Sequence, residues 1–250
     1  FDPIEYYASY PRKVISRPGY PTRAAFKSTF MFKLFGNRLL REAGGIATYA
    51  DIGGCFGFGA NAMGYQISRR QQDWPETTIF EISPEFVKIG KILFPHLEYV
   101  EADFREWDED DRGFDLVSMF DVVEHIVDPG SLLRAVAARS RYLLLLTPME
   151  TSGEWRGGKA PAEQGENHRD GHINFFTPQA YEELLDSSQL DILGSALMPS
   201  LVTSRTRDIL YPEQLESSGN PRRVGWPRRI ASRALRGLPG IPWRLKRKIF

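Results

Sequence analysis

The stretch YADIGGCFGFGANAM, residues Tyr49 to Met63, decides the fold of this chain. It starts with a short apolar run that ends at Asp51, passes through a glycine-rich turn and leads into small residues that suit a helix start. Glycine adopts positive φ values and lets a ligand approach the backbone closely, because it has no Cβ. A helix that begins after such a turn points free backbone N–H groups at the ligand. The pattern therefore predicts a strand–loop–helix unit that binds a nucleotide-like cofactor.

Two kinds of cofactor fit this loop. Gly57, Gly59 and Ala62 satisfy the G-x-G-x-x-G/A pattern of dinucleotide-binding folds, in which a later carboxylate such as Glu81 holds a ribose. A second pattern, acidic-x-Gly-x-x-x-Gly, is met by Asp51, Gly53 and Gly57. The spacing favours the second pattern, because a dinucleotide fold places its first glycine directly after the strand, whereas Gly57 comes later.

The residues around this loop alternate between strand and helix patterns. Strands are expected at residues 49–52, 78–82, 97–101, 114–120 and 142–147, and helices at residues 60–70, 84–93 and 131–139. Near-continuous apolar strands that alternate with helices predict an α/β fold whose parallel sheet is buried on both faces. Such sheets bind ligands at the carboxyl ends of their strands.

The ordered set of motifs resembles that of class I S-adenosylmethionine-dependent methyltransferases, over about residues 50–206. The first loop is similar to their motif I, although Cys55 stands where a glycine is usual. FDLVSMFDVVEHIVDP (114–129) looks like motif IV of the families related to ubiquinone biosynthesis enzymes, and GHINFFTPQAYEELL (171–185) is similar to their segment after strand five. The resemblance implies a Rossmann-like, seven-stranded, mostly parallel sheet with helices on both faces. Segments 190–198 and 201–205 would supply its antiparallel final strand.

The resemblance also implies which residues bind S-adenosylmethionine. Asp51 would bind the amino group of its methionine part, directly or through water, and Glu81 would accept from both ribose hydroxyls. Asp103 would accept from the adenine amino group. The other expected cofactor-binding residues are the loop members Gly53, Gly54, Cys55, Gly57 and Gly59, the ring-stacking pair Ile82 and Phe104, and Phe120 and Asp121 beside the sulfonium.

Cys55 is the only cysteine, so the chain cannot form an intramolecular disulfide. No secretory pattern and no apolar run of about 18 residues is present, and these features together predict a cytoplasmic protein. The Cys55 thiol is either a small side chain packed beneath the cofactor or a nucleophile. The first interpretation is favoured, because no activating histidine is adjacent in sequence.

Three histidines are candidates for a general base. His125 follows the fourth predicted strand, and His168 and His172 belong to the segment after the fifth. An imidazole accepts a proton near neutral pH. Methyl transfer from a sulfonium depends mainly on alignment of the acceptor, so a base would help without being essential. The alternative for each histidine is a hydrogen bond that fixes its loop.

Two sets of residues could ligate a metal ion. His168 and His172 have the spacing of a helical metal pair, but nearby glycines argue against a helix there. Asp121, Glu124 and Asp128 could hold Mg²⁺ together with substrate oxygens. Methyl transfer needs neither set, and we expect a metal-independent enzyme.

Length and composition fit one principal domain with two flanking segments. We expect an N-terminal cap at residues 1–47, a cofactor-binding core at 48–206 with a lid loop at 148–170, and a basic amphipathic tail at 207–250. In the cap, Tyr6, Tyr7 and Tyr10 are the first candidates for shaping the acceptor site.

The formal net charge of zero hides a strong polarity along the chain. Up to Glu216 the sequence carries 22 basic and 32 acidic residues, a charge of −10, and the remainder carries +10. Basic residues interleaved with tryptophan and aliphatic residues suit an anionic membrane surface or a lipid-linked acceptor. Packing of the tail on the acidic core and binding to nucleic acid are the alternatives, the latter the least favoured.

These observations and the resemblance lead to one expected function and two alternatives. We expect an S-adenosylmethionine-dependent methyltransferase that methylates an oxygen of a small molecule or glycan, which could be lipid-linked. An NAD(P)-dependent oxidoreductase and a catalytically inactive, methyltransferase-like binding subunit are the alternatives.

Overall fold

The structure is a computed structural model that describes residues 19–108, 112–149, 172–197 and 248–249. The chain divides into two compact units, residues 1–193 with 245–250 and residues 194–244. Every helix and strand described below belongs to the first unit. Of the second unit, the structure describes only residues 194–197.

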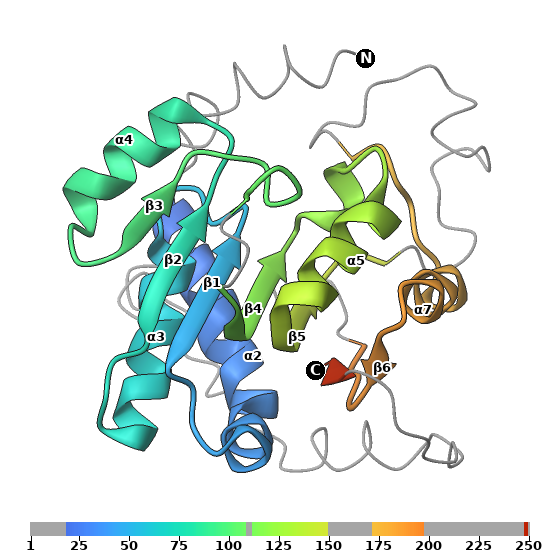
Figure 1. The fold of residues 1–250 in the computed structure, drawn as a ribbon, viewed down its shortest axis with the longest axis horizontal. Coiled ribbons are helices and arrows are strands. Elements are labelled where there is room, and N and C mark those ends of the chain that lie inside the picture. The colour runs from blue at the N-terminus through green and yellow to red at the C-terminus, as the bar shows by residue number, and fades with distance from the viewer. Residues whose placement is uncertain (1–18, 109–111, 150–171, 198–247, 250) are drawn as a thin grey trace, which may run out of the picture. The chain divides into compact units, whose positions relative to one another are not determined.

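A parallel sheet lies at the centre of the first unit (Figure 1). Its five principal strands are, in spatial order, β3 (Glu98–Val100), β2 (Glu76–Phe80), β1 (Thr48–Ile52), β4 (Phe114–Phe120) and β5 (Ser140–Leu146). In β1, Asp51 lies opposite Ile79 of β2 and Ser118 of β4. The strand order reverses between β1 and β4, and in open α/β sheets ligands bind at such a reversal, outside the carboxyl ends of the strands.

Two strands of two residues each extend the sheet beyond β5. β7 (Lys248–Ile249) pairs parallel with β5, and β6 (Asp191–Ile192) pairs parallel with β7. The expected antiparallel final strand is therefore not confirmed: every strand pair among the described residues is parallel, and segment 201–205 lies outside them. The parallel five-stranded part of the predicted Rossmann-like sheet is confirmed.

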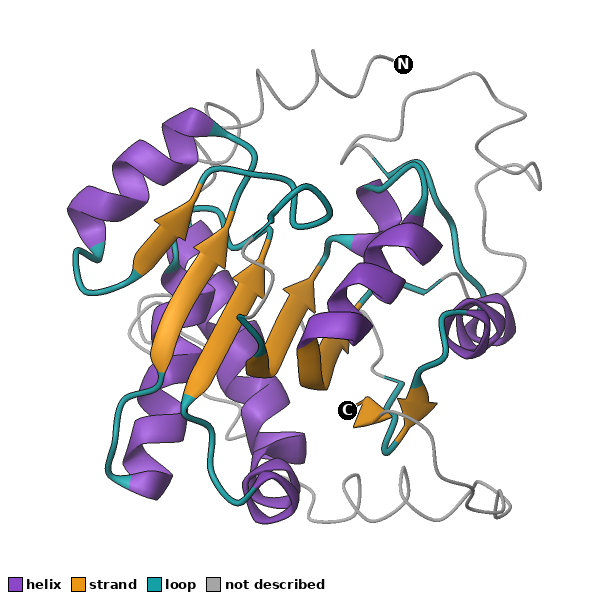
Figure 2. Cartoon of the chain, viewed as in Figure 1, coloured by secondary structure: helices purple, strands orange, loops and turns teal. Residues whose placement is uncertain are grey.

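Helices cover both faces of the sheet (Figure 2). They are α2 (Tyr20–Ala43), α3 (Phe58–Gln71), α4 (Pro84–Leu93), α5 (Pro129–Arg139) and α7 (Pro178–Ser187), with the short 3-10 helix η1 (Val123–His125) after β4. Tyr49 packs with α2 and α3 on one face, whereas its neighbour Ala50 packs with α5 and α7 on the other. This alternation explains why the strands are apolar throughout, because both faces are buried.

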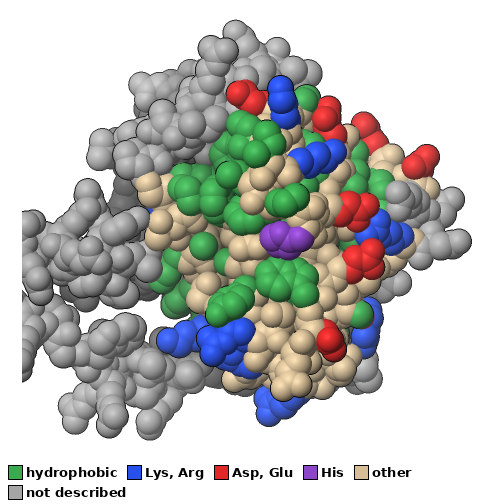
Figure 3. All heavy atoms as spheres, turned by 90° about the vertical axis from the view of Figure 1, so that its left-hand side faces the viewer, with side chains coloured by type: hydrophobic (Ala, Val, Ile, Leu, Met, Phe, Trp, Pro, Cys, Tyr) green, Lys and Arg blue, Asp and Glu red, His purple; other side chains and the backbone are tan. Residues whose placement is uncertain are grey.

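The free edge of the sheet at β3 carries charged side chains. Arg112 pairs with Glu98 at 2.6 Å and with Glu76 at 3.5 Å, across the short outer strand. Figure 3 shows this side of the molecule, where charged side chains border apolar ones around a histidine. Charges on a short edge strand discourage further strand pairing. Within the described residues, no helix is both long and apolar enough to cross a membrane.

Candidate active site

The loop between β1 and α3 folds around glycines. Gly53 and Gly57 have φ values of 69° and 88°, and Gly57 N–H donates to the carbonyl of Gly54 at 2.9 Å, which closes the turn. A Cβ on Gly54 would lie 2.9 Å from Asp51 Oδ2 and from the Ile79 side chain. The loop therefore approaches β1 and β2 more closely than other residue types allow.

Cys55 occupies a position that favours glycine, since its φ is 50°. Its backbone N–H donates to Glu81 Oε2 at 3.0 Å, and its thiol contacts the carbonyl of Gly53 at 3.5 Å. Burial raises the pKa of the Cys55 thiol well above its ordinary value, and the negative charge of Glu81 adds to this effect. A thiol that stays protonated suits packing better than nucleophilic attack.

Glu81 lies directly after β2 and is 6% exposed. Its Oε2 accepts from Cys55 N–H, and its Oε1 accepts from Ser83 N–H at 2.9 Å. Burial raises the pKa of Glu81, and these backbone hydrogen bonds oppose the rise. Each carboxylate oxygen keeps a second lone pair, so Glu81 has the capacity to accept from two neighbouring hydroxyls, as expected for a ribose.

Asp51 lies beside this loop, near the end of β1, and is 4% exposed. Its Oδ1 accepts from the Ser118 hydroxyl, and Ser118 also bonds the Tyr49 hydroxyl at 2.7 Å. Burial raises the pKa of Asp51 to about 7, while the Ser118 hydrogen bond lowers it and the charge of Glu81 raises it further. A positive group such as a ligand's ammonium would therefore favour the ionised form of Asp51.

The residues expected around an adenine ring have different environments. Asp103, after β3, accepts from Arg105 Nε at 3.0 Å, and this hydrogen bond holds the pKa of Asp103 below its ordinary value. Ile82 is 54% exposed, whereas Phe104 is 1% exposed and packs edge-to-face on Phe80 with ring centroids 4.8 Å apart. Ile82 is thus open to a ligand, and the core encloses the Phe104 ring.

Asp121 follows β4 and faces a lysine that the sequence reasoning missed. It has a φ of 56°, its N–H donates to Leu146 at 2.8 Å, and its side chain forms an ion pair with Lys27 of α2. Burial lowers the pKa of Lys27, and the nearby charge of Glu124 opposes this. Phe120 packs partly buried against the cluster that contains α2 and α3. Lys27 belongs to a helix that precedes all the strands, far in sequence from Asp121. No local feature of the sequence therefore indicates the contact between Lys27 and Asp121.

The structure brings together two of the three candidate bases and places Glu124 between them. The Nε2 atoms of His125 and His172 lie 3.9 Å and 4.0 Å from Glu124 Oε1, and the two rings meet at 77° with centroids 4.9 Å apart. Glu124 is 1% exposed, and burial raises its pKa to about 7. We call these three residues the Glu–His–His cluster.

Backbone hydrogen bonds hold this cluster together. The Glu124 carbonyl accepts from Ile173 and Asn174 N–H, each at 2.9 Å, and thereby places the segment that carries His172 against η1. His168, residues 150–170 of the expected lid loop 148–170, and Tyr6, Tyr7 and Tyr10 lie outside the described residues.

The expected Mg²⁺ ligands do not act as one set. Asp121 pairs with Lys27, and Asp128 caps α5 by accepting from Ser131 N–H at 2.9 Å. Only Glu124 of the three belongs to a group of side chains whose geometry suits a metal ion, and its partners are the two histidines.

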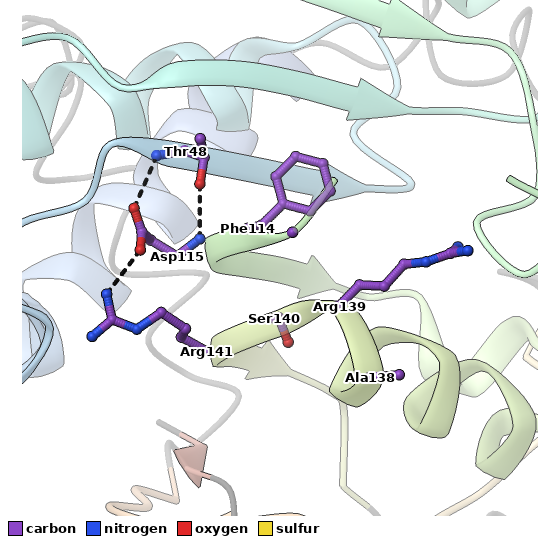
Figure 4. A pocket seen from close by; sticks show the side chains of 8 residues that line it. Thr48, Phe114, Asp115, Ala138, Arg139, Ser140 and Arg141 are labelled. Carbon is purple, nitrogen blue, oxygen red and sulfur yellow. Dashed lines mark hydrogen bonds and ion pairs between the residues drawn. The ribbon is translucent and has the colours of Figure 1, made fainter. Parts of the chain in front are cut away.

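A separate pocket of about 390 Å³ lies at the opposite ends of the strands (Figure 4). It is lined by Thr48, Gly113, Phe114, Asp115, Ala138, Arg139, Ser140 and Arg141. Asp115 accepts from Arg141 Nη1 at 2.9 Å and from Thr48 N–H at 3.2 Å. This pocket is distinct from the candidate site, because it lies at the amino ends of β4 and β5.

A comparison with protein families covers the part of the chain that contains the candidate site. A family model described as "Methyltransferase domain" matches residues 37–194. No curated protein matches the sequence.

Several solved structures are similar to this chain. The N-terminal domain of EvdMO1, with SAH bound, is 16% identical with a TM-score of 0.47, covering 66% of this chain and 71% of its own. The YcgJ protein from Bacillus subtilis is 15% identical with a TM-score of 0.46, covering 61% and 66%. The mitomycin 7-O-methyltransferase MmcR is 18% identical with a TM-score of 0.44, covering 62% and 48%.

Proposed function

The chain belongs to the family of methyltransferase domains, and from this premise we propose that it transfers the methyl group of S-adenosylmethionine to an oxygen of a small-molecule or glycan acceptor. The observation that carries the proposal is the arrangement of Asp51 and Glu81 around the glycine loop. Both carboxylates are buried, at adjacent strand ends, within the matched residues. One suits the cofactor's ammonium group, and the other suits its ribose.

The cofactor's other parts fit the surrounding residues. The loop from Gly53 to Gly59 would wrap the methionine part, and Asp103 and Ile82 would contact the adenine. Asp121 follows β4 at the strand-order reversal, where the sulfonium would lie. Because the sulfonium and the Lys27 ammonium are both cations, binding of the cofactor would compete with the ion pair between Lys27 and Asp121.

Alignment of the acceptor with the methyl group supplies most of the catalysis in this proposal, on the order of 7 to 11 kcal/mol. The Glu–His–His cluster follows β4, on the side where the acceptor would enter. His125 or His172 would accept the hydroxyl proton of the acceptor as oxygen attacks the methyl carbon, contributing roughly 10² to 10⁴-fold in rate. Glu124, once ionised, would stabilise the imidazolium that results.

Calorimetric titration tests the cofactor assignment. The protein should bind S-adenosylhomocysteine, and Glu81→Gln should weaken this binding about tenfold or more, because a hydrogen bond to a charged group contributes roughly 1.5 to 3 kcal/mol. The matched control is Glu85→Gln, which removes an exposed carboxylate four residues away and should leave binding unchanged.

The same titration separates the alternatives. Binding of NADH in place of S-adenosylhomocysteine would favour an oxidoreductase. Binding of S-adenosylhomocysteine without methyl transfer to any acceptor in a broad screen would favour an inactive binding subunit. Methylation of nitrogen instead of oxygen would correct only the acceptor atom.

We also propose that the basic tail directs the enzyme to an anionic membrane surface or to a lipid-linked acceptor. The support is its composition, ten basic residues interleaved with apolar ones after Glu216. Except for β7, residues 207–250 lie outside the described part of the chain.

A further inference from the structure

Glu124 is a carboxylate that the fold buries without a hydrogen bond. It is 1% exposed, and neither Oε1 nor Oε2 has a hydrogen-bond partner among the described residues. The nearby ammonium of Lys27 bonds Asp121 instead. An ionised carboxylate in such surroundings is costly unless a cation compensates its charge. The site therefore favours either a proton or a bound cation on Glu124.

Two imidazoles converge on the same carboxylate oxygen. The Nε2 atoms of His125 and His172 lie 3.9 Å and 4.0 Å from Oε1, and the three candidate ligand atoms all lie within 4.8 Å of one another. In a tetrahedral site with metal–ligand bonds of about 2.0 to 2.1 Å, ligand atoms are roughly 3.3 Å apart. Small side-chain rotations would bring all three atoms onto one ion.

We propose that Glu124, His125 and His172 bind a divalent transition-metal ion of the Zn²⁺ or Co²⁺ type. The donor set decides the class of ion. Two imidazoles and one carboxylate suit first-row transition metals, whereas Mg²⁺ prefers an all-oxygen set. This proposal departs from the expectation of a metal-independent enzyme, and its ligands differ from the acidic set considered for Mg²⁺.

The backbone positions the ligands independently of any ion. Glu124 and His125 are neighbours in η1, and His172 is held against them by the bonds from Ile173 and Asn174 N–H to the Glu124 carbonyl. The Asn174 side chain adds donations to the carbonyls of Val123 at 3.3 Å and Ile126 at 2.6 Å. These bonds involve neither the Glu124 carboxylate nor the ring nitrogens of the two histidines.

The site itself does not depend on the proposed function, but its role in methyl transfer does. Three protein ligands leave coordination positions open, and an ion with open positions can hold an acceptor oxygen and lower the pKa of its hydroxyl. With the ion bound, the Nε2 lone pairs of His125 and His172 are occupied. In the metal-bound protein the histidines would orient the acceptor through the ion in place of acting as bases, and the proton of the acceptor hydroxyl would pass to solvent water.

Titration of the full, untagged chain with Co²⁺ after treatment with a chelator tests the proposal. One equivalent should bind and produce the visible absorption bands of Co²⁺ with mixed nitrogen and oxygen ligands, and an equal concentration of Mg²⁺ should not displace it. His125→Gln and His172→Gln should each weaken binding at least about tenfold. The control is His96→Gln, because His96 is an exposed histidine that bonds Asn61.

The variant Glu124→Gln distinguishes a loss of metal binding from a loss of folding. It removes a buried charge, so its unfolding midpoint in chelator should equal or exceed that of the wild type, while the rise of the midpoint on adding Co²⁺ should disappear. Weak binding by the wild type, with Kd above about 1 mM, would overturn the proposal, as would unchanged binding in both histidine variants.

Titration with S-adenosylhomocysteine in chelator keeps the two proposals separate. If Co²⁺ binds and S-adenosylhomocysteine does not, the methyltransferase proposal fails and the metal site stands. If S-adenosylhomocysteine binds and Co²⁺ does not, the metal site fails alone.

Discussion

At the scale of single residues, Asp51 shows how burial and hydrogen bonding oppose each other. Burial raises its pKa to about 7, and the Ser118 hydrogen bond limits the rise. The folded protein therefore keeps a proton on Asp51 over a pH range in which the unfolded chain has released it. Protein stability should fall as pH rises through that range, because the folded state binds more protons there.

We expect Asp51→Asn to reduce this pH dependence. Between the ordinary pKa of 3.8 and about 7, the free energy of unfolding of the wild type should decrease with rising pH, and the decrease should be smaller in the variant. Urea denaturation at several pH values measures the slope. Asp73→Asn, at an exposed site, should retain the wild-type slope. An unchanged slope in Asp51→Asn would show that other buried carboxyl groups cause the effect.

The sequence indicated the position of some residues of the candidate site and not of others. Asp51 and Glu81 were predicted because each lies at the end of an apolar strand, where a local pattern indicates position. Lys27 was missed, since its contact with Asp121 depends on how α2 packs. The pairing of Glu124 with His172 was also missed, because it arises from backbone bonds between distant segments.

At the scale of secondary structure elements, α7 determines how the segment after β5 continues. Its N-cap is Thr177, whose Oγ1 accepts from Ala180 N–H at 3.1 Å, and Tyr181 in its first turns bonds Thr147 at 2.8 Å. Threonine is a common N-cap residue and proline a common first helical residue, and Thr177 and Pro178 occupy these two positions. The cap thus fixes the start of the helix that follows His172 and the two residues, Ile173 and Asn174, that bond the Glu124 carbonyl.

Thr177→Ala should destabilise the protein by about 1 kcal/mol, because it removes the acceptor of the cap. Thr177→Ser keeps a hydroxyl and serves as the control, with little expected loss. The difference in urea midpoint between the two variants measures the cap. If both variants lose stability equally, the methyl group of Thr177 contributes more to the stability of the protein than its hydroxyl does.

Strands were easier to predict than the first helix. The expected strand at residues 114–120 agrees with β4 residue for residue, since an uninterrupted apolar run has clear ends. Helix α2 was not predicted, because its many aromatic residues obscured a helical period that includes Met31, Phe35 and Leu39. Strand β6 lies within the expected strand segment 190–198, but β6 and β7 have too few residues for a pattern that fixes their bounds or their pairing.

At the scale of the whole molecule, the charge polarity of the chain leads to a prediction about membranes. The variant Arg228→Gln with Arg229→Gln should bind anionic, phosphatidylserine-containing vesicles about tenfold or more weakly than the wild type, since each basic residue near such a surface contributes roughly 1 kcal/mol. Sedimentation with the vesicles measures this binding.

Substitution is preferable to truncation in this experiment. Removing the end of the chain would also remove β7, which pairs with β5. Lys88→Gln with Lys91→Gln removes two exposed cations from α4 and serves as the matched control. Equal sedimentation of both double variants would argue that the tail packs on the protein's own acidic core or serves another partner.

The α/β class and the position of the candidate site at the carboxyl ends of the strands were predictable from the order of the elements alone. Alternating apolar strands and helices leave few arrangements other than a parallel sheet covered on both faces. The final part of the sheet was not predictable, because β7 comes from the far end of the chain and pairs parallel between β5 and β6.

The attachment of residues 173 and 174 to the Glu124 carbonyl has a consequence for sequence variation. These bonds use only main-chain atoms of Ile173 and Asn174, so they place few demands on the identity of the residues that precede them. Insertions, deletions or substitutions between residues 150 and 171 should therefore leave the position of His172 unchanged. Proteins built on this plan could therefore vary that segment while the Glu–His–His cluster keeps its geometry.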